Sequence, residues 1–156
     1  MSLAAEVLAA AKARGVMIAT AESCTGGMVA AALTDIPGSS AVVERGFVTY
    51  TNAAKTEMLG VRPETLAAHG AVSEEVAREM AEGALVYSHA TLAVAITGIA
   101  GPGGSEFKPE GRVCFGLAQA GAQTNVETVE FGAPGRDKVR SAARDHALGL
   151  LLRALG

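Results

Sequence analysis

The chain has 156 residues, a formal net charge of −3, 49% hydrophobic residues and 19% charged residues. This length fits one domain, which we predict to span residues 1–156, and the dispersed lysines and arginines lack the concentrated positive surface that nucleic-acid binding requires. No apolar run reaches the roughly 18 residues that cross a membrane, and the two cysteines have no zinc-ligand spacing, so we predict a cytoplasmic protein without nucleic-acid, membrane or metal partners.

The first third of the chain alternates helical and strand patterns. Apolar residues repeat at helical spacing over residues 2–14, and Gly15 follows as a stop signal. The apolar run VMIATA, residues 16–21, is typical of a buried strand. A helix is predicted from Thr25 to Thr34, and the β-branched and aromatic stretch RGFVTYT, residues 45–51, favours a second strand.

The middle of the chain is predicted to be mostly helical. A short helix covers residues 53–59, and the stretch PETLAAH forms one or two further turns. Ser73 is placed to cap a longer helix. The predicted buried face of that helix consists of Val76, Met80, Ala84 and Tyr87.

The last part of the chain predicts three strands and a helix. The apolar stretch TLAVAIT, residues 91–97, forms a third buried strand, and a glycine-rich loop follows at 98–110. The stretches RVCFGLAQ and NVETVEFG are joined by only five residues, which implies an antiparallel hairpin, and residues 136–154 form the last helix. Helices alternating with buried strands predict an α/β fold: a three-layer α/β/α sandwich with a mixed, mostly parallel sheet of about five strands.

Ligands of open α/β sheets bind outside the carboxyl ends of the parallel strands. Three segments leave the predicted sheet at such ends: AESCTGG, TYTNAAK and TGIAGPGGSEFKPEG. Ser23, at the first strand-to-helix turn, has backbone N–H groups beside it, which suits a nucleophile whose attack creates an oxyanion. The alternative is that Ser23 or Thr25 only caps the helix. Cys24 is a rival nucleophile, although no histidine is an obvious partner for it.

Lys55 is the second candidate catalytic residue. If Asn52 caps the short helix, Lys55 occupies its third position, where the positive helix end disfavours the ammonium form and lowers the lysine pKa. A neutral lysine serves as the base in Ser–Lys hydrolases, and the alternative is a solvated surface lysine.

The glycine-rich loop and the start of the last helix suggest a place for an anion. Gly98, Gly101 and Gly103 allow backbone N–H groups to approach a ligand closely, as phosphate-binding loops do. Arg136 opens the last helix and is a bidentate donor suited to phosphate or carboxylate. The alternatives are an ordinary mobile loop and a surface arginine.

Taken in order, several stretches resemble the CinA C-terminal domain family, the nicotinamide-nucleotide amidohydrolases. They are TAESCTGG, GSSAVVERGFVTYTNAAKTEMLGV, HGAVSEEVAREMA, ITGIAGPGGSEFKPEGRVCFG and GRDKVR. The resemblance covers residues 5–153 and implies hydrolysis of the carboxamide of nicotinamide mononucleotide to nicotinate mononucleotide and ammonia, without a metal or cofactor. It also implies a three-layer α/β/α fold and a homo-oligomer.

Carried onto this sequence, the resemblance makes Ser23 the nucleophile and Lys55 the base. Tyr50, expected to be a third catalytic residue, and Arg136, expected to bind substrate, match further functional positions in base activation or ligand binding. Backbone N–H groups in the turn formed by Cys24, Thr25, Gly26 and Gly27 are then expected to hold the oxyanion. The 98–104 loop and Arg136 are expected to bind the 5′-phosphate. The alternative function is a non-catalytic nucleotide-binding or regulatory module of the competence/damage-inducible type.

Overall fold

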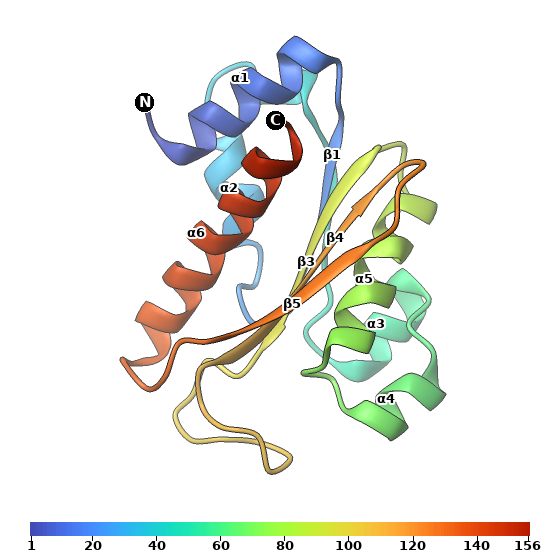
Figure 1. The fold of residues 1–156 in the computed structure, drawn as a ribbon, viewed down its shortest axis with the longest axis vertical. Coiled ribbons are helices and arrows are strands. Elements are labelled where there is room, and N and C mark those ends of the chain that lie inside the picture. Colours follow the sequence, from blue (N-terminus) through green and yellow to red (C-terminus); the bar gives the residue numbers. More distant parts are fainter.

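The computed structural model describes all 156 residues and contains one five-stranded sheet in the order β2-β1-β3-β4-β5 (Figure 1). β1 runs parallel to both β2 and β3, whereas β4 is antiparallel to β3 and to β5. The predicted mixed sheet that ends in an antiparallel hairpin is therefore confirmed. The strands are β1 Ile18–Glu22, β2 Val43–Val48, β3 Leu92–Gly98, β4 Arg112–Gln119 and β5 Asn125–Glu130.

Helices cover both faces of the sheet, which confirms the predicted three layers (Figure 1). One face packs against α1 (Leu3–Arg14), α2 (Met28–Thr34) and α6 (Arg136–Ala154). The other face packs against α3 (Asn52–Leu59), α4 (Pro63–His69) and α5 (Glu74–Val86). A short 3-10 helix, Ser39–Ala41, precedes β2.

The two faces of the sheet carry side chains of different size. On β3, Leu92, Val94 and Ile96 face the core shared with α1, α2 and α6, whereas Ala93 and Ala95 face α5. Successive side chains of a strand point to opposite faces, so the large residues lie on one face of the sheet and the small residues on the other. The small residues bring α5 close: a Cβ on Gly116 would lie only 2.4 Å from the carbonyl oxygen of Ala77. A chain with few aromatic residues can thus build a dense core.

Several predicted boundaries and one predicted core residue differ from the structure, and most strand ends move by one to three residues. α2 begins at Met28 rather than Thr25. Gly26 and Gly27 have positive φ angles of 59° and 106°, which a right-handed helix does not contain, so the helix starts after them. β2 ends at Val48 rather than at residue 51. α3 begins one residue early, at Asn52. Tyr87, predicted to be buried, follows the last residue of α5 and is 52% exposed.

No helix is long enough and apolar enough to cross a membrane.

Candidate active site

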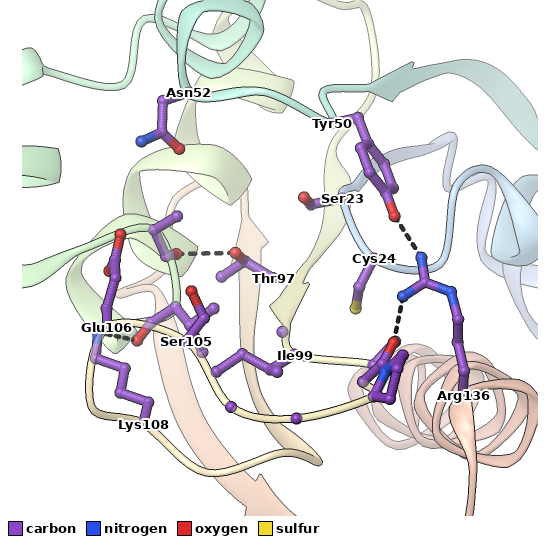
Figure 2. A pocket seen from close by; sticks show the side chains of 18 of the residues that line it. Ser23, Cys24, Tyr50, Asn52, Thr97, Ile99, Ser105, Glu106, Lys108 and Arg136 are labelled. Atoms are coloured by element: carbon purple, nitrogen blue, oxygen red, sulfur yellow. Dashed lines mark hydrogen bonds between the residues drawn. The ribbon is translucent and has the colours of Figure 1, made fainter.

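A cavity of about 310 Å³ opens where the three parallel strands end. β2 and β3 lie on opposite sides of β1, so the chain leaves β1 and its neighbours in different directions and a crevice forms between the following segments. Ser23 and Cys24 follow β1, Tyr50 follows β2, and the 98–106 segment follows β3 (Figure 2). The structure thus brings together the three segments that the sequence placed at strand ends.

Ser23 and Lys55 are in direct contact at the base of this cavity. The Nζ atom of Lys55 donates hydrogen bonds to Oγ of Ser23 at 3.0 Å and to the carbonyl oxygen of Thr49 at 3.0 Å. Ser23 is 8% exposed and Lys55 only 1% exposed. A hydroxyl and an amine at this distance have the geometry that a serine nucleophile and a lysine base require.

Burial lowers the pKa of Lys55, because the ammonium form loses hydration inside the protein. No carboxylate forms an ion pair with it to oppose this effect. The direction predicted from the sequence is confirmed, but the largest cause is desolvation. The expected cap was wrong: Thr51 caps α3 by accepting a bond from the Ala54 N–H at 3.1 Å, so Lys55 lies at the fourth helical position instead of the third.

The turn after Ser23 leaves several backbone donors free. The N–H of Gly26 donates to the carbonyl oxygen of Ser23 at 3.0 Å, whereas the N–H groups of Cys24, Thr25 and Gly27 have no acceptor within the chain. Cys24 lines the cavity, whereas Thr25, Gly26 and Gly27 do not. The residue after the nucleophile commonly supplies an oxyanion donor, so the Cys24 N–H is the best placed of these groups.

Neither Ser23 nor Thr25 caps α2. Gly27 is the N-cap residue and has no side chain to offer. The carboxylate of Glu22 takes that place by accepting bonds from the N–H groups of Val29 and Ala30, each at 3.0 Å. The capping alternative for Ser23 is therefore wrong, and its hydroxyl is free to take part in chemistry.

The thiol of Cys24 is unsuited to be the nucleophile. Burial raises its pKa to about 11, which leaves the thiol protonated near neutral pH. None of the three histidines lines the cavity. His146 instead contacts Glu127 through Nε2 at 2.7 Å and packs on Phe115 with ring centroids 4.5 Å apart.

We expect Cys24→Ala to retain activity within about threefold of the unmodified protein, because a neutral thiol contributes no charge or base and only the backbone at this position is used. The measurement is the steady-state rate of amide hydrolysis, together with the rate of thiol alkylation by iodoacetamide in the native protein. Slow alkylation and retained turnover are the expected pair of results. Complete loss of turnover in a folded Cys24→Ala variant would return the nucleophile role to the thiol.

A bridge of side chains spans one end of the cavity. Arg136, the first residue of α6, donates from Nη1 to the carbonyl oxygen of Gly101 at 2.6 Å and from Nη2 to the Tyr50 hydroxyl at 2.7 Å (Figure 2). The bridge therefore joins the segment after β2, the glycine-rich loop and the last helix. All three residues line the cavity, so the guanidinium charge lies at its wall.

Three glycines of the loop have distinct reasons to be glycine. A Cβ on Gly98 would lie 2.7 Å from the Val113 side chain, so its absence permits the close pairing of β3 and β4. Gly101 and Gly103 hold positive φ angles of 91° and 80°. The Gly103 N–H donates to Glu110 at 2.6 Å, whereas the Gly101 N–H has no acceptor within the chain. The Gly101 N–H is thus free to bind an anion.

Several residues of the site were not singled out from the sequence. Thr97, the last residue but one of β3, donates to the carbonyl oxygen of Ala71 at 2.8 Å. Lys108 donates to the carbonyl oxygens of His69 and Val72 at 2.6 Å each. These bonds attach the turn before α5 to the cavity wall. Thr97 had a readable signal, since it is a polar residue at the end of an apolar strand. No group of three or more His, Cys, Asp or Glu side chains could hold a metal ion.

The chain is similar to known proteins over almost its whole length. Residues 1–155 match the family described as the CinA C-terminal domain. The nicotinamide-nucleotide amidohydrolase PncC of Escherichia coli (strain K12) is 56% identical over 152 residues, covering 97% of this chain and 92% of that protein. A putative competence-damage inducible protein of Symbiobacterium thermophilum is 54% identical over 151 residues, covering 91% of this chain and 35% of that protein. The crystal structure of the competence/damage inducible protein CihA from Agrobacterium tumefaciens has a TM-score of 0.94 and 51% identity, covering 98% of this chain and 93% of that one.

Proposed function

The chain belongs to the CinA C-terminal domain family, and from this membership and its 56% identity to PncC over nearly its whole length we infer that it is a nicotinamide-nucleotide amidohydrolase. It hydrolyses the carboxamide of nicotinamide mononucleotide to nicotinate mononucleotide and ammonia. The observation that supports a catalytic role over mere binding is the 3.0 Å contact between the Ser23 hydroxyl and the buried amine of Lys55.

The Ser–Lys pair supports a two-step mechanism. Neutral Lys55 accepts the Ser23 proton while Oγ forms a bond to the carboxamide carbon, and the carbonyl π electrons move to oxygen. Free backbone N–H groups of the turn, with Cys24 the first of them, stabilise that oxyanion. When the tetrahedral intermediate collapses, the C–N bond breaks and Lys55 returns its proton to the departing ammonia. Water, deprotonated by Lys55, then cleaves the acyl ester and restores the Ser23 hydroxyl.

The cavity wall formed by Arg136 and the glycine-rich loop supports binding of the 5′-phosphate. Arg136 and the unpaired N–H of Gly101 lie there, and both are donors that suit a phosphate. The cavity, at about 310 Å³, lies within the range of small-molecule ligand pockets.

The direct test is ammonia release by the purified protein from four substrates: nicotinamide, its riboside, its mononucleotide and the dinucleotide. We expect the mononucleotide to have the highest kcat/KM. A ligand that binds but is recovered unchanged would favour the nucleotide-binding or regulatory module, and preference for the dinucleotide would contradict the proposed substrate.

Replacing Arg136 tests the phosphate site. We expect Arg136→Met to raise KM for the mononucleotide about 10- to 100-fold, the effect of losing one charge-assisted hydrogen bond of roughly 1.5–3 kcal/mol. The KM for the riboside, which has no phosphate, should change much less. Equal changes for the two substrates would show that Arg136 acts only through its bridge to Tyr50. Tyr50→Phe, which removes that bridge and keeps the guanidinium, is the matched control.

The predicted cytoplasmic location and homo-oligomeric state remain predictions. Light scattering on the purified chain distinguishes a monomer from an oligomer.

A further inference from the structure

The turn formed by Ser23–Gly27 carries both the nucleophile and the free backbone donors, yet it contains two glycines and little side-chain mass. Gly26 and Gly27 have positive φ angles, so the backbone there has conformational freedom that must be removed for the donors to stay aligned. Two charged side chains from outside the turn contact it from different elements. They are Glu22 at the end of β1 and Arg140 on α6.

Glu22 holds the turn from the side of α2. Its side chain is fully buried, and Oε1 accepts hydrogen bonds from the Thr25 hydroxyl at 2.6 Å and from the Val29 N–H at 3.0 Å. Oε2 accepts from the Ala30 N–H at 3.0 Å. One carboxylate thus ties the middle of the turn to the first turn of the following helix, with bonds that its charge makes short and strong.

Arg140 holds the turn from the side of α6. Its Nε donates to the carbonyl oxygen of Cys24 at 3.0 Å and its Nη2 approaches the carbonyl oxygen of Thr25 at 3.4 Å. The guanidinium lies against the turn, since a Cβ on Gly26 would be 3.3 Å from Nη2. Arg140 is one helical turn beyond Arg136, so α6 presents both arginines toward the site from one face.

Two carbonyls of the turn, those of Ser23 and Cys24, belong to peptide groups with free N–H donors. The carbonyl of Ser23 accepts from the Gly26 N–H and shares its peptide group with the Cys24 N–H. The carbonyl of Cys24 accepts from Arg140 and shares its peptide group with the Thr25 N–H. A hydrogen bond to the carbonyl of a peptide polarises its N–H and makes it a stronger donor. In a trans peptide the N–H points opposite to the carbonyl, so fixing the carbonyl also fixes the direction of the donor.

We propose that Glu22 and Arg140 are positioning residues that clamp the Ser23–Gly27 turn, so that its free N–H groups are aligned and polarised for the oxyanion. This inference rests on the proposed amidohydrolase function and adds to it two residues that do not line the cavity. Because an oxyanion exists only after attack, the clamp acts on the transition state more than on bound substrate. Its loss should therefore lower kcat and leave KM nearly unchanged.

The test is steady-state hydrolysis of nicotinamide mononucleotide by Arg140→Met, Arg140→Lys and Glu22→Gln, with folding checked by circular dichroism. We expect Arg140→Met to lower kcat about 10- to 100-fold, less than the 10²–10³-fold that loss of an oxyanion donor itself costs. KM should change by less than about threefold. Arg140→Lys, which keeps the charge and can donate to one carbonyl, should recover part of kcat. Glu22→Gln, which places an amide NH₂ against an N–H donor or the Thr25 hydroxyl, should also lower kcat.

The matched control is Arg144→Met, one turn further along α6, where the arginine hydrogen-bonds only to the neighbouring Asp145 and does not touch the Ser23–Gly27 turn. It should keep wild-type kcat and KM. The clamp is overturned if folded Arg140→Met keeps wild-type kcat, if its loss appears in KM alone, or if Arg140→Lys is no better than Arg140→Met. If Arg140→Met does not fold, the proposal is tested by comparing the kcat of Arg140→Lys with the kcat of the control Arg144→Met. A wild-type protein that releases no ammonia would contradict the proposed function itself, a result distinct from all of these.

Discussion

Ser23→Ala is expected to lower kcat for ammonia release from nicotinamide mononucleotide by about 10⁴- to 10⁶-fold, as loss of the nucleophile does in other serine hydrolases. The hydroxyl is the only group of the site that both lies in the cavity and contacts the buried amine of Lys55. Without it the amide must be attacked directly by water, with no acyl-enzyme intermediate. The measurement is single-turnover ammonia release at high enzyme concentration, so that a residual rate is detected.

A matched serine supports the interpretation of that loss. Ser141 lies on α6 with its hydroxyl bonded to the carbonyl oxygen of Lys138, away from the cavity, and Ser141→Ala should retain full activity. Circular dichroism of Ser23→Ala should match the unmodified protein, since one small hydroxyl is removed. Near-normal ammonia release by folded Ser23→Ala would rule out the Ser–Lys mechanism.

The fold was predictable because its buried strands are continuous apolar runs. In TLAVAIT every residue but the terminal threonines is apolar, as expected when helices cover both faces. The short AGAQT connection correctly predicted the hairpin of β4 and β5. The strand order could not be derived in this way, since the position of β1 between β2 and β3 depends on how distant segments pack.

The boundaries that were misplaced have local causes. Thr51 and Asn52 are both favoured N-cap residues, so N-cap propensity alone does not tell which of these two adjacent residues caps α3. Tyr87 fits the helical spacing of α5 but comes one residue after its end, where the backbone turns it outward. The predicted helix included Gly26 and Gly27. In the structure both glycines have positive φ angles and precede α2.

The sequence predicted the site residues that combine a reactive side chain with a position after a strand end. It missed residues whose contacts come from distant parts of the chain. Ser23 and Lys55 are 32 residues apart, and only the parallel pairing of β1 and β2 makes their contact possible. Glu22 and Arg140 escaped notice because a charged residue at a strand end or on a helix is usually solvated. Their burial against one turn is a property of the packed molecule, and Arg140 reaches the carbonyl of Cys24 across 116 residues of chain.

Lys55→Met is expected to lower kcat/KM for the mononucleotide by about 10²- to 10⁴-fold at neutral pH, the usual contribution of a general base. Methionine fills most of the volume of the buried lysine stem but can neither accept the Ser23 proton nor return it to ammonia. The thermal midpoint of unfolding should stay near that of the unmodified protein. The buried amine of Lys55 costs free energy because it is desolvated, and methionine replaces it with an apolar group that has no such cost. Lys138→Met, on an exposed position of α6, is the matched control and should be fully active.

The pH profile separates a base role for Lys55 from a structural one. The amine must be neutral to accept a proton, so kcat/KM should rise with pH through the pKa of Lys55 and then level off. Burial disfavours the ammonium form, which places this inflection below the ordinary lysine value of about 10.4. Cys24→Ala should show the same inflection, because the rise depends on the amine of Lys55 and not on the thiol. Lys55→Met should lose the inflection. A Lys55→Met variant that keeps the alkaline rise would assign the titration to another group and contradict the Ser–Lys mechanism.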